Sequence, residues 1–307
     1  MTQTRKNSLV GSILLALAAI IWGSSFVAQS EGAEFVGPFT FIAIRSFLGS
    51  AVLLPVVFVS DTIKKKTKPE EYHKMTKADY KYLIKGGLAC GAVLFAASNL
   101  QQLGIDGGTA PGMAAFITAL YILLVPIFSI FLGKKIRPII WGCVGVSVVA
   151  LYMLCVKEGG AVHGSDFYVL ACAACYAVHI LIIDKVSPKL DGIRLSALQF
   201  FVAGLITLVP MLLTEETSWE ALKAAAPSIA YSGIMSSGVA FTLQILGQQK
   251  TEPTIATMIM SLESVFGVLT AMIILSQVPT PREAIGCVLM FGAIIVAQLP
   301  EKQKKKQ

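Results

Sequence analysis

Long apolar runs separated by short charged segments dominate the pattern of the chain. At about 1.5 Å of rise per residue, a helix of about 20 residues crosses a hydrocarbon core about 30 Å thick. The pattern therefore predicts an all-α polytopic membrane protein with ten transmembrane helices. The predicted spans are 7–30, 36–60, 86–105, 107–133, 138–156, 167–183, 195–214, 224–249, 254–275 and 284–300.

Composition supports this class. The chain is 55% apolar and 14% charged, with a mean hydropathy of +0.73, whereas a soluble domain carries about 25% charged residues. The net charge of +7 does not indicate a nucleic-acid partner, because the lysines lie in short loops between the apolar runs. The expected surroundings are the lipid bilayer of the cell (plasma or inner) membrane.

The distribution of Lys and Arg predicts the orientation. With the N-terminus in the cytoplasm, 21 of the 25 Lys and Arg residues fall in cytoplasmic segments and 3 in outer loops, while Arg45 lies within a span. Such a bias is the positive-inside signal. It favours an even number of helices with both termini in the cytoplasm.

The ten predicted helices divide into two sets of five, residues 1–157 and residues 158–307, the second with a basic cytoplasmic tail. The first set begins inside and the second begins outside, so that two halves of the same fold would be inverted in the membrane. Many transporters use this arrangement to place a binding site near the bilayer midplane.

Several motifs spread over the chain resemble the drug/metabolite transporter superfamily, EamA type. The expected second helix matches through Pro38 and Arg45, and the sequence departs from the family at Ser264, where a proline is common, and at the ends of helices four and nine, where acidic residues are common. The other matching stretches are Trp22 to Phe26, Ala114 to Gly133, Tyr176 to His179, Leu198 to Phe200, Ser236 to Gln244 and Pro253 to Glu263.

The resemblance implies ten helices in two inverted five-helix repeats, and export or exchange of small organic metabolites such as amino acids. It implies alternating access and leaves the solute open. Proton coupling, an uncoupled facilitator and a monomer or homodimer all remain open at this stage.

Glu263 is the candidate for proton coupling, because it is the one charge in the span 254–275 and lies near its middle. An acidic group at that depth should face the protein interior or a water-filled cavity. Burial favours the neutral carboxyl, which could then exchange a proton near neutral pH. The alternative is a structural, hydrogen-bonded acid on a packed helix face.

Arg45 is the candidate for binding a solute carboxylate, since its planar guanidinium suits bidentate recognition. It lies about 12 Å from the outer end of its span by helical rise. Two alternatives are that the side chain extends toward the outer surface, or that it pairs with Glu263 as a structural salt bridge.

Four further residues are candidates for contact with solute. Trp22 and Tyr121 are expected at mid-depth, where their rings could stack on an aromatic or cationic solute. Gln244 and His179 are polar groups within spans. The alternative for all four is core packing or helix-to-helix hydrogen bonding.

Competing functions have little support. The nucleotide-binding pattern G-x-x-x-x-G-K-[ST] and the zinc-protease pattern H-E-x-x-H are absent from the sequence. No catalytic residue, cofactor or metal site is predicted, and a membrane enzyme is the least favoured alternative. A channel would need a repeated pore loop, and none is evident.

Overall fold

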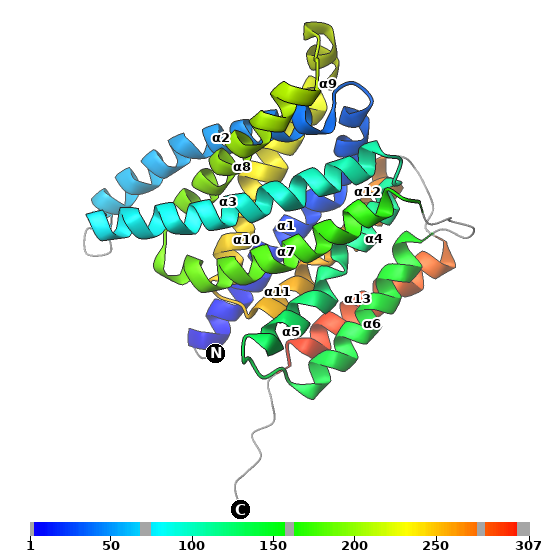
Figure 1. Cartoon of the computed structure of the whole chain (residues 1–307). Coiled ribbons are helices and arrows are strands. Elements are labelled where there is room, and N and C mark those ends of the chain that lie inside the picture. Colours follow the sequence, from blue (N-terminus) through cyan, green and yellow to red (C-terminus); the bar gives the residue numbers. More distant parts are fainter. Residues whose placement is uncertain (1–2, 68–74, 157–162, 275–279, 300–307) are drawn as a thin grey trace, which may run out of the picture.

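The computed structural model describes residues 3–67, 75–156, 163–274 and 280–299, and this part of the chain is helical without any strand (Figure 1). The basic tail lies outside the described residues. In chain order, the elements are α1 (Gln3–Ala33), α2 (Pro38–Thr67), α3 (Lys77–Asp106), α4 (Pro111–Ala119), α5 (Tyr121–Phe131), α6 (Pro138–Cys155), α7 (Asp166–Val186), η1 (Ser187–Lys189), α8 (Gly192–Thr214), α9 (Trp219–Tyr231), η2 (Ser232–Ala240), α10 (Phe241–Gln248), α11 (Pro253–Met260), α12 (Leu262–Ile274) and α13 (Pro281–Ala297).

Eight helical segments of the described chain are long and apolar enough to cross a membrane. Three of them are composite, because α4 continues into α5, α7 continues into η1, and α9 continues through η2 into α10. The interrupted pair α11 and α12 and the shorter helix α13 occupy the remaining two predicted spans. The prediction of an all-α polytopic membrane protein is confirmed.

The helices extend further than the apolar runs predict. α2 continues to Thr67 and α3 begins at Lys77, so the predicted 25-residue loop 61–85 is much shorter. The lysines in the last turn of α2 favour helix there, since cations stabilise a helix C-terminus. Thr76 and Asp79 form a capping box that starts α3. Charged residues therefore end the apolar run without ending the helix.

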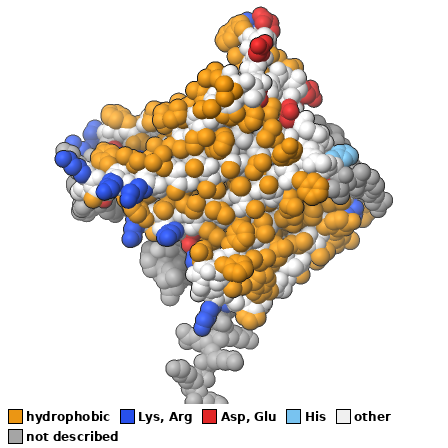
Figure 2. Space-filling model, viewed as in Figure 1, with side chains coloured by type: hydrophobic (Ala, Val, Ile, Leu, Met, Phe, Trp, Pro, Cys, Tyr) orange, Lys and Arg blue, Asp and Glu red, His pale blue; other side chains and the backbone are white. Residues whose placement is uncertain are grey.

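The outer surface of the bundle is apolar around its middle and charged at its ends. Figure 2 shows hydrophobic side chains covering most of the visible face, with Lys and Arg gathered toward the end where α2 and α3 meet. Acidic side chains gather at the opposite end, near α9. Bulky side chains such as Phe131 and Leu213 are about four-fifths exposed, as expected where lipid replaces water. The chain is a multi-pass protein of the cell membrane.

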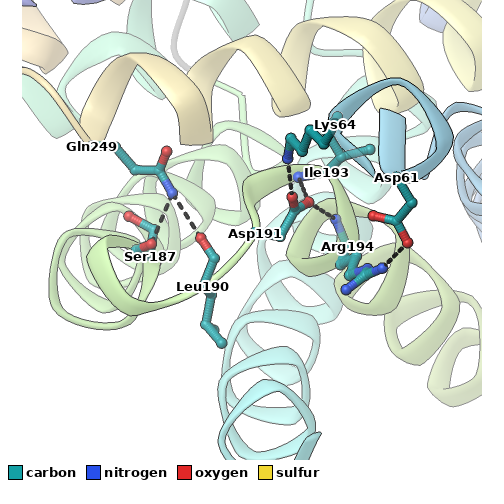
Figure 3. Close-up of polar contacts among 8 residues, drawn as sticks. All are labelled: Asp61, Lys64, Ser187, Leu190, Asp191, Ile193, Arg194 and Gln249. Atoms are coloured by element: carbon teal, nitrogen blue, oxygen red, sulfur yellow. Dashed lines mark hydrogen bonds and ion pairs between the residues drawn. The ribbon is translucent and has the colours of Figure 1, made fainter. Parts of the chain in front are cut away.

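α2 and α8 run antiparallel and are joined at both ends. At one end Lys64 pairs with Asp191 at 3.0 Å, and Arg194 pairs with Asp61 (Figure 3). Burial raises the pKa of Asp191, but the backbone N–H of Arg194 and the ammonium of Lys64 outweigh it, so that this pKa lies below its usual value.

At the other end, the carboxylate of Glu215 accepts bonds from the backbone N–H groups of Phe39 and Thr40 at 2.9 and 2.7 Å. These are free donors at the start of α2, where an anion is favoured. Residues from the two predicted halves of the chain thus hold α2 against α8 at opposite ends of the bundle.

Candidate functional site

A cavity lies within the helical bundle. Its wall is built by α1, α2, α3, α4 and α5 from the first half of the chain, and by α7, η2, α10, α11 and α12 from the second. The structure brings five of the six predicted site residues to this cavity: Arg45, Trp22, Tyr121, Gln244 and Glu263.

Two interrupted spans meet at the cavity. The span containing α4 and α5 is interrupted at Leu120, and the span containing α11 and α12 at Ser261. Tyr121 and Glu263 follow these interruptions, and the Tyr121 hydroxyl donates to Glu263 Oε1 at 3.2 Å. Glu263 is buried in the first turn of α12, where the helix N-terminus stabilises negative charge.

The two interruptions have different local causes. Pro126 lies within α5, and Leu120, where the span is interrupted, precedes it by six residues, or between one and two turns. A proline ring clashes with the carbonyl four residues before it, here that of Ile122, so the strain falls on the N-terminal side.

The break at Ser261 is not predicted by the sequence pattern. Here the Ser261 hydroxyl donates to the carbonyl of Thr257 at 2.9 Å, and the Thr257 hydroxyl donates to the carbonyl of Thr254 at 2.8 Å. Serine and threonine hydroxyls that bond back to the preceding turn bend helices.

Gly23 allows α1 to approach α12 closely at the level of Glu263. A Cβ atom at residue 23 would lie 2.7 Å from both the carbonyl oxygen of Glu263 and the backbone nitrogen of Gly267. Any side chain there would push the two backbones apart. The glycine of the Trp22 to Phe26 motif therefore fixes the position of the backbone that carries Glu263.

Arg45 is buried, with 4% of its surface exposed. Its guanidinium donates to three neutral acceptors, Gln29 Oε1 at 3.0 Å, Ser237 Oγ at 3.2 Å and Ser236 Oγ at 3.3 Å. The ion pairs of the described residues do not include Arg45. The suggested structural salt bridge between Arg45 and Glu263 is therefore not formed.

Aromatic side chains form one wall of the cavity. The Phe241 ring contacts Trp22 edge to face, with centroids 5.0 Å apart, and lies 6.5 Å from the Tyr176 ring. Edge-to-face and tilted contacts of this kind stabilise the packing of the rings. These three rings offer an apolar surface beside the charged and polar groups.

His179 lies behind this wall and does not line the cavity. Its Nε2 atom is 3.0 Å from Gln199 Oε1, and its ring lies 6.2 Å from that of Phe241. Gln244 does reach the cavity, and its Nε2 donates to Gln248 Oε1 at 3.0 Å. The predicted set is thus split, with His179 separated from the others by Phe241.

Sequence reasoning missed several lining residues, among them Gln29, Ser236, Tyr176 and Phe241. Ser236 is a small residue, so its type alone does not distinguish it from other residues of membrane helices. Polar type within a span was a signal available for Gln29. No group of three or more His, Cys, Asp and Glu side chains placed to hold a metal occurs among the described residues.

Comparison with known families agrees with this architecture. The model of the EamA-like transporter family matches residues 9–156 and again residues 164–298. The chain belongs to the EamA-like transporter family. It is thus a membrane transporter by family, and its long apolar helices and the cavity lined by both halves of the chain fit that assignment.

Relatives of this EamA-like transporter match along nearly its whole length. An uncharacterized transporter of Archaeoglobus fulgidus is 26% identical over 293 residues, covering 95% of this chain and 86% of the relative. The uncharacterized transporter YwfM of Bacillus subtilis is 24% identical over 300 residues, covering 95% of each chain. One crystal structure shares the fold with a TM-score of 0.74 and 18% identity, covering 94% of this chain and 96% of its own.

Proposed function

We propose that this protein is a secondary transporter that exports or exchanges small organic solutes, of the amino-acid type, by alternating access. The observation that supports this most is the cavity itself. It joins residues of both halves of the chain, lies at two helix interruptions, and contains a buried Arg45 and a buried Glu263. Interrupted helices at mid-membrane are typical of solute sites in secondary transporters.

In the proposed mechanism the two halves, residues 1–157 and 158–307, are inverted repeats that rock about the cavity. Arg45 binds the carboxylate of the solute, because a guanidinium provides charge and paired donors. The rings of Trp22, Tyr176 and Phe241 contact its apolar part. The two halves then expose the occupied cavity to one side of the membrane and afterwards to the other.

Glu263 is proposed to carry the coupled proton. In its ionised form it accepts the hydrogen bond that Tyr121 donates at 3.2 Å. Burial opposes that charge and favours protonation when no cationic group is near. Uptake and release of one proton at this carboxyl would then accompany exchange of the solute.

The experiment is counterflow in proteoliposomes with a panel of labelled amino acids, comparing wild type with Glu263→Gln at two pH values. We expect the wild type to exchange at least one amino acid in a pH-dependent way and Glu263→Gln to lose the pH dependence. Glu252→Gln is a matched control, because Glu252 is an exposed acid at the start of the same span.

The outcomes separate the parts of the proposal. Unchanged, pH-dependent exchange by Glu263→Gln would show that Glu263 is structural, and exchange insensitive to pH in the wild type would favour an uncoupled facilitator. If the wild type moves no amino acid of the panel, the amino-acid class is wrong for this protein.

A further inference from the structure

The guanidinium of Arg45 has unused hydrogen-bonding capacity of a defined kind. It carries five N–H groups, of which three donate to Gln29, Ser236 and Ser237, one from each nitrogen. One N–H on Nη1 and one on Nη2 remain. Two such donors match the two oxygens of one carboxylate.

The positive charge of Arg45 also has no counter-ion among the described residues. All three acceptors are neutral, and no carboxylate of the described residues forms an ion pair with it. A buried cation without a counter-ion is costly. An anionic group that enters the cavity would therefore be stabilised at Arg45 without first displacing a carboxylate of the protein.

The helix opposite Arg45 has an unusual form that brings two neighbouring serines to it. Ser236 and Ser237 are consecutive, yet both hydroxyls accept from the one guanidinium. They lie in η2, which is a π-helix of nine residues. Such segments are rare and frequently occur at functional sites.

Gly49 permits this approach from the side of α2. It lies four residues after Arg45, and therefore on the same face of the helix. A Cβ atom at residue 49 would be 2.6 Å from Ser237 Cβ. This close approach of α2 to η2 holds the Ser237 hydroxyl within reach of the Arg45 guanidinium, which itself lines the cavity.

We infer that Gln29, Ser236 and Ser237 are positioning residues that hold the Arg45 guanidinium with two N–H groups directed to the carboxylate of the solute. This inference rests on the proposed function. It adds that the site selects solutes with a free carboxylate and rejects the corresponding amides. The neutrality of the three acceptors is essential, because an acidic residue among them would replace the solute as the counter-ion.

The test places such an acid at residue 29. Gln29→Glu keeps the size of the side chain and adds a carboxylate beside Nη1, whereas Gln29→Met keeps the size and removes the acceptor. Ser236→Ala with Ser237→Ala removes both hydroxyls. Ser232→Ala is the matched control, because Ser232 is fully buried in the same π-helix and its hydroxyl has no partner.

The first readout is the thermal shift of the purified protein by L-amino acids and by their amides at matched concentrations. In the wild type and in Ser232→Ala, we expect acids to stabilise and amides to have at least tenfold weaker effect. We expect Gln29→Glu to lose the effect of the acids. The double serine variant should show about 5- to 10-fold weaker binding, because the guanidinium loses the two hydroxyls that orient it, with little change in maximal exchange rate.

The second readout needs no solute and no transport. If the charge of Arg45 has no counter-ion in the absence of solute, the Gln29→Glu variant without solute should have a higher Tm than the wild type. The Gln29→Met variant should have a lower Tm than the wild type. A Tm of Gln29→Glu at or below that of Gln29→Met would overturn the inference. So would equal binding of acids and amides, or a double serine variant that behaves like Ser232→Ala.

Failure of the proposed function is distinguishable from failure of this inference. If no acid stabilises the wild type and none is exchanged, the amino-acid class is wrong. The order of Tm values among the variants at residue 29 then still decides whether a carboxylate placed beside the Arg45 guanidinium stabilises the protein.

Discussion

Replacing Gly23 by alanine tests the close packing that carries Glu263. The added Cβ would lie 2.7 Å from the carbonyl oxygen of Glu263 and from the backbone nitrogen of Gly267. Both are backbone atoms, so a side-chain rotation cannot relieve the overlap. α1 and α12 must move apart, which displaces the backbone that carries Glu263.

The expected magnitude combines two opposing effects. Overpacking of a well-packed core costs about 1–3 kcal/mol, while glycine to alanine within a helix gains about 0.5–1 kcal/mol. We expect Gly23→Ala to destabilise the protein by about 1–2 kcal/mol. At about 2–4 °C per kcal/mol, its Tm should fall by about 2–8 °C.

The assay is thermal unfolding of the purified variants, followed by counterflow in proteoliposomes. Gly142→Ala is the matched control, because Gly142 lies in the membrane helix α6 and a Cβ there would meet no atom within 4 Å. Its Tm should equal or exceed that of the wild type. If Gly23→Ala matches Gly142→Ala in Tm and in exchange rate, the argument from the close approach of α1 and α12 is refuted.

Three further changes test other contacts. Asp191→Ala should lower the stability by about 1–2 kcal/mol, through loss of a helix cap and a partly exposed ion pair. Because the folded pKa of Asp191 is lowered, this difference in Tm should be full at neutral pH and disappear as the pH falls through that pKa. Tyr121→Phe should shift the pH profile of exchange upward, since the ionised Glu263 loses a donor, and an unchanged profile would argue against coupling at this pair. Glu215→Gln should lower the Tm slightly, by about 0.3–1 kcal/mol of stability, because the start of α2 loses an anion; an unchanged Tm would contradict this.

The spans and the two buried charges could be predicted from the sequence because each depends on local physical constraints. An apolar, uncharged run of about 20 residues is typical of a helix that crosses a bilayer. A single charge within such a run is too costly to face lipid, and Arg45 and Glu263 indeed reach one cavity. The ends of the helices were less predictable, because charged residues such as Lys64 continue a helix into water.

The details of the site depend on contacts between residues far apart in sequence. The break at Ser261 arises where hydroxyls compete for backbone carbonyls, and many serines in membrane helices have no such effect. The partners of Arg45 include Ser237, almost 200 positions away, and no local pattern links the two. The position of His179 behind Phe241 likewise follows from how α7 packs against α10, which hydropathy alone does not specify.

The two junctions of α2 with α8 differ in how they respond to ionic strength. One consists of ion pairs between side chains that are about one-fifth to two-fifths exposed, Lys64 with Asp191 and Arg194 with Asp61. The other consists of Glu215 on backbone N–H groups at short range. Dissolved salt screens exposed charge pairs more than short hydrogen bonds. Raising the salt concentration therefore weakens the Lys64 end selectively, and any conformational equilibrium that separates α2 from α8 there shifts toward opening on that side of the membrane.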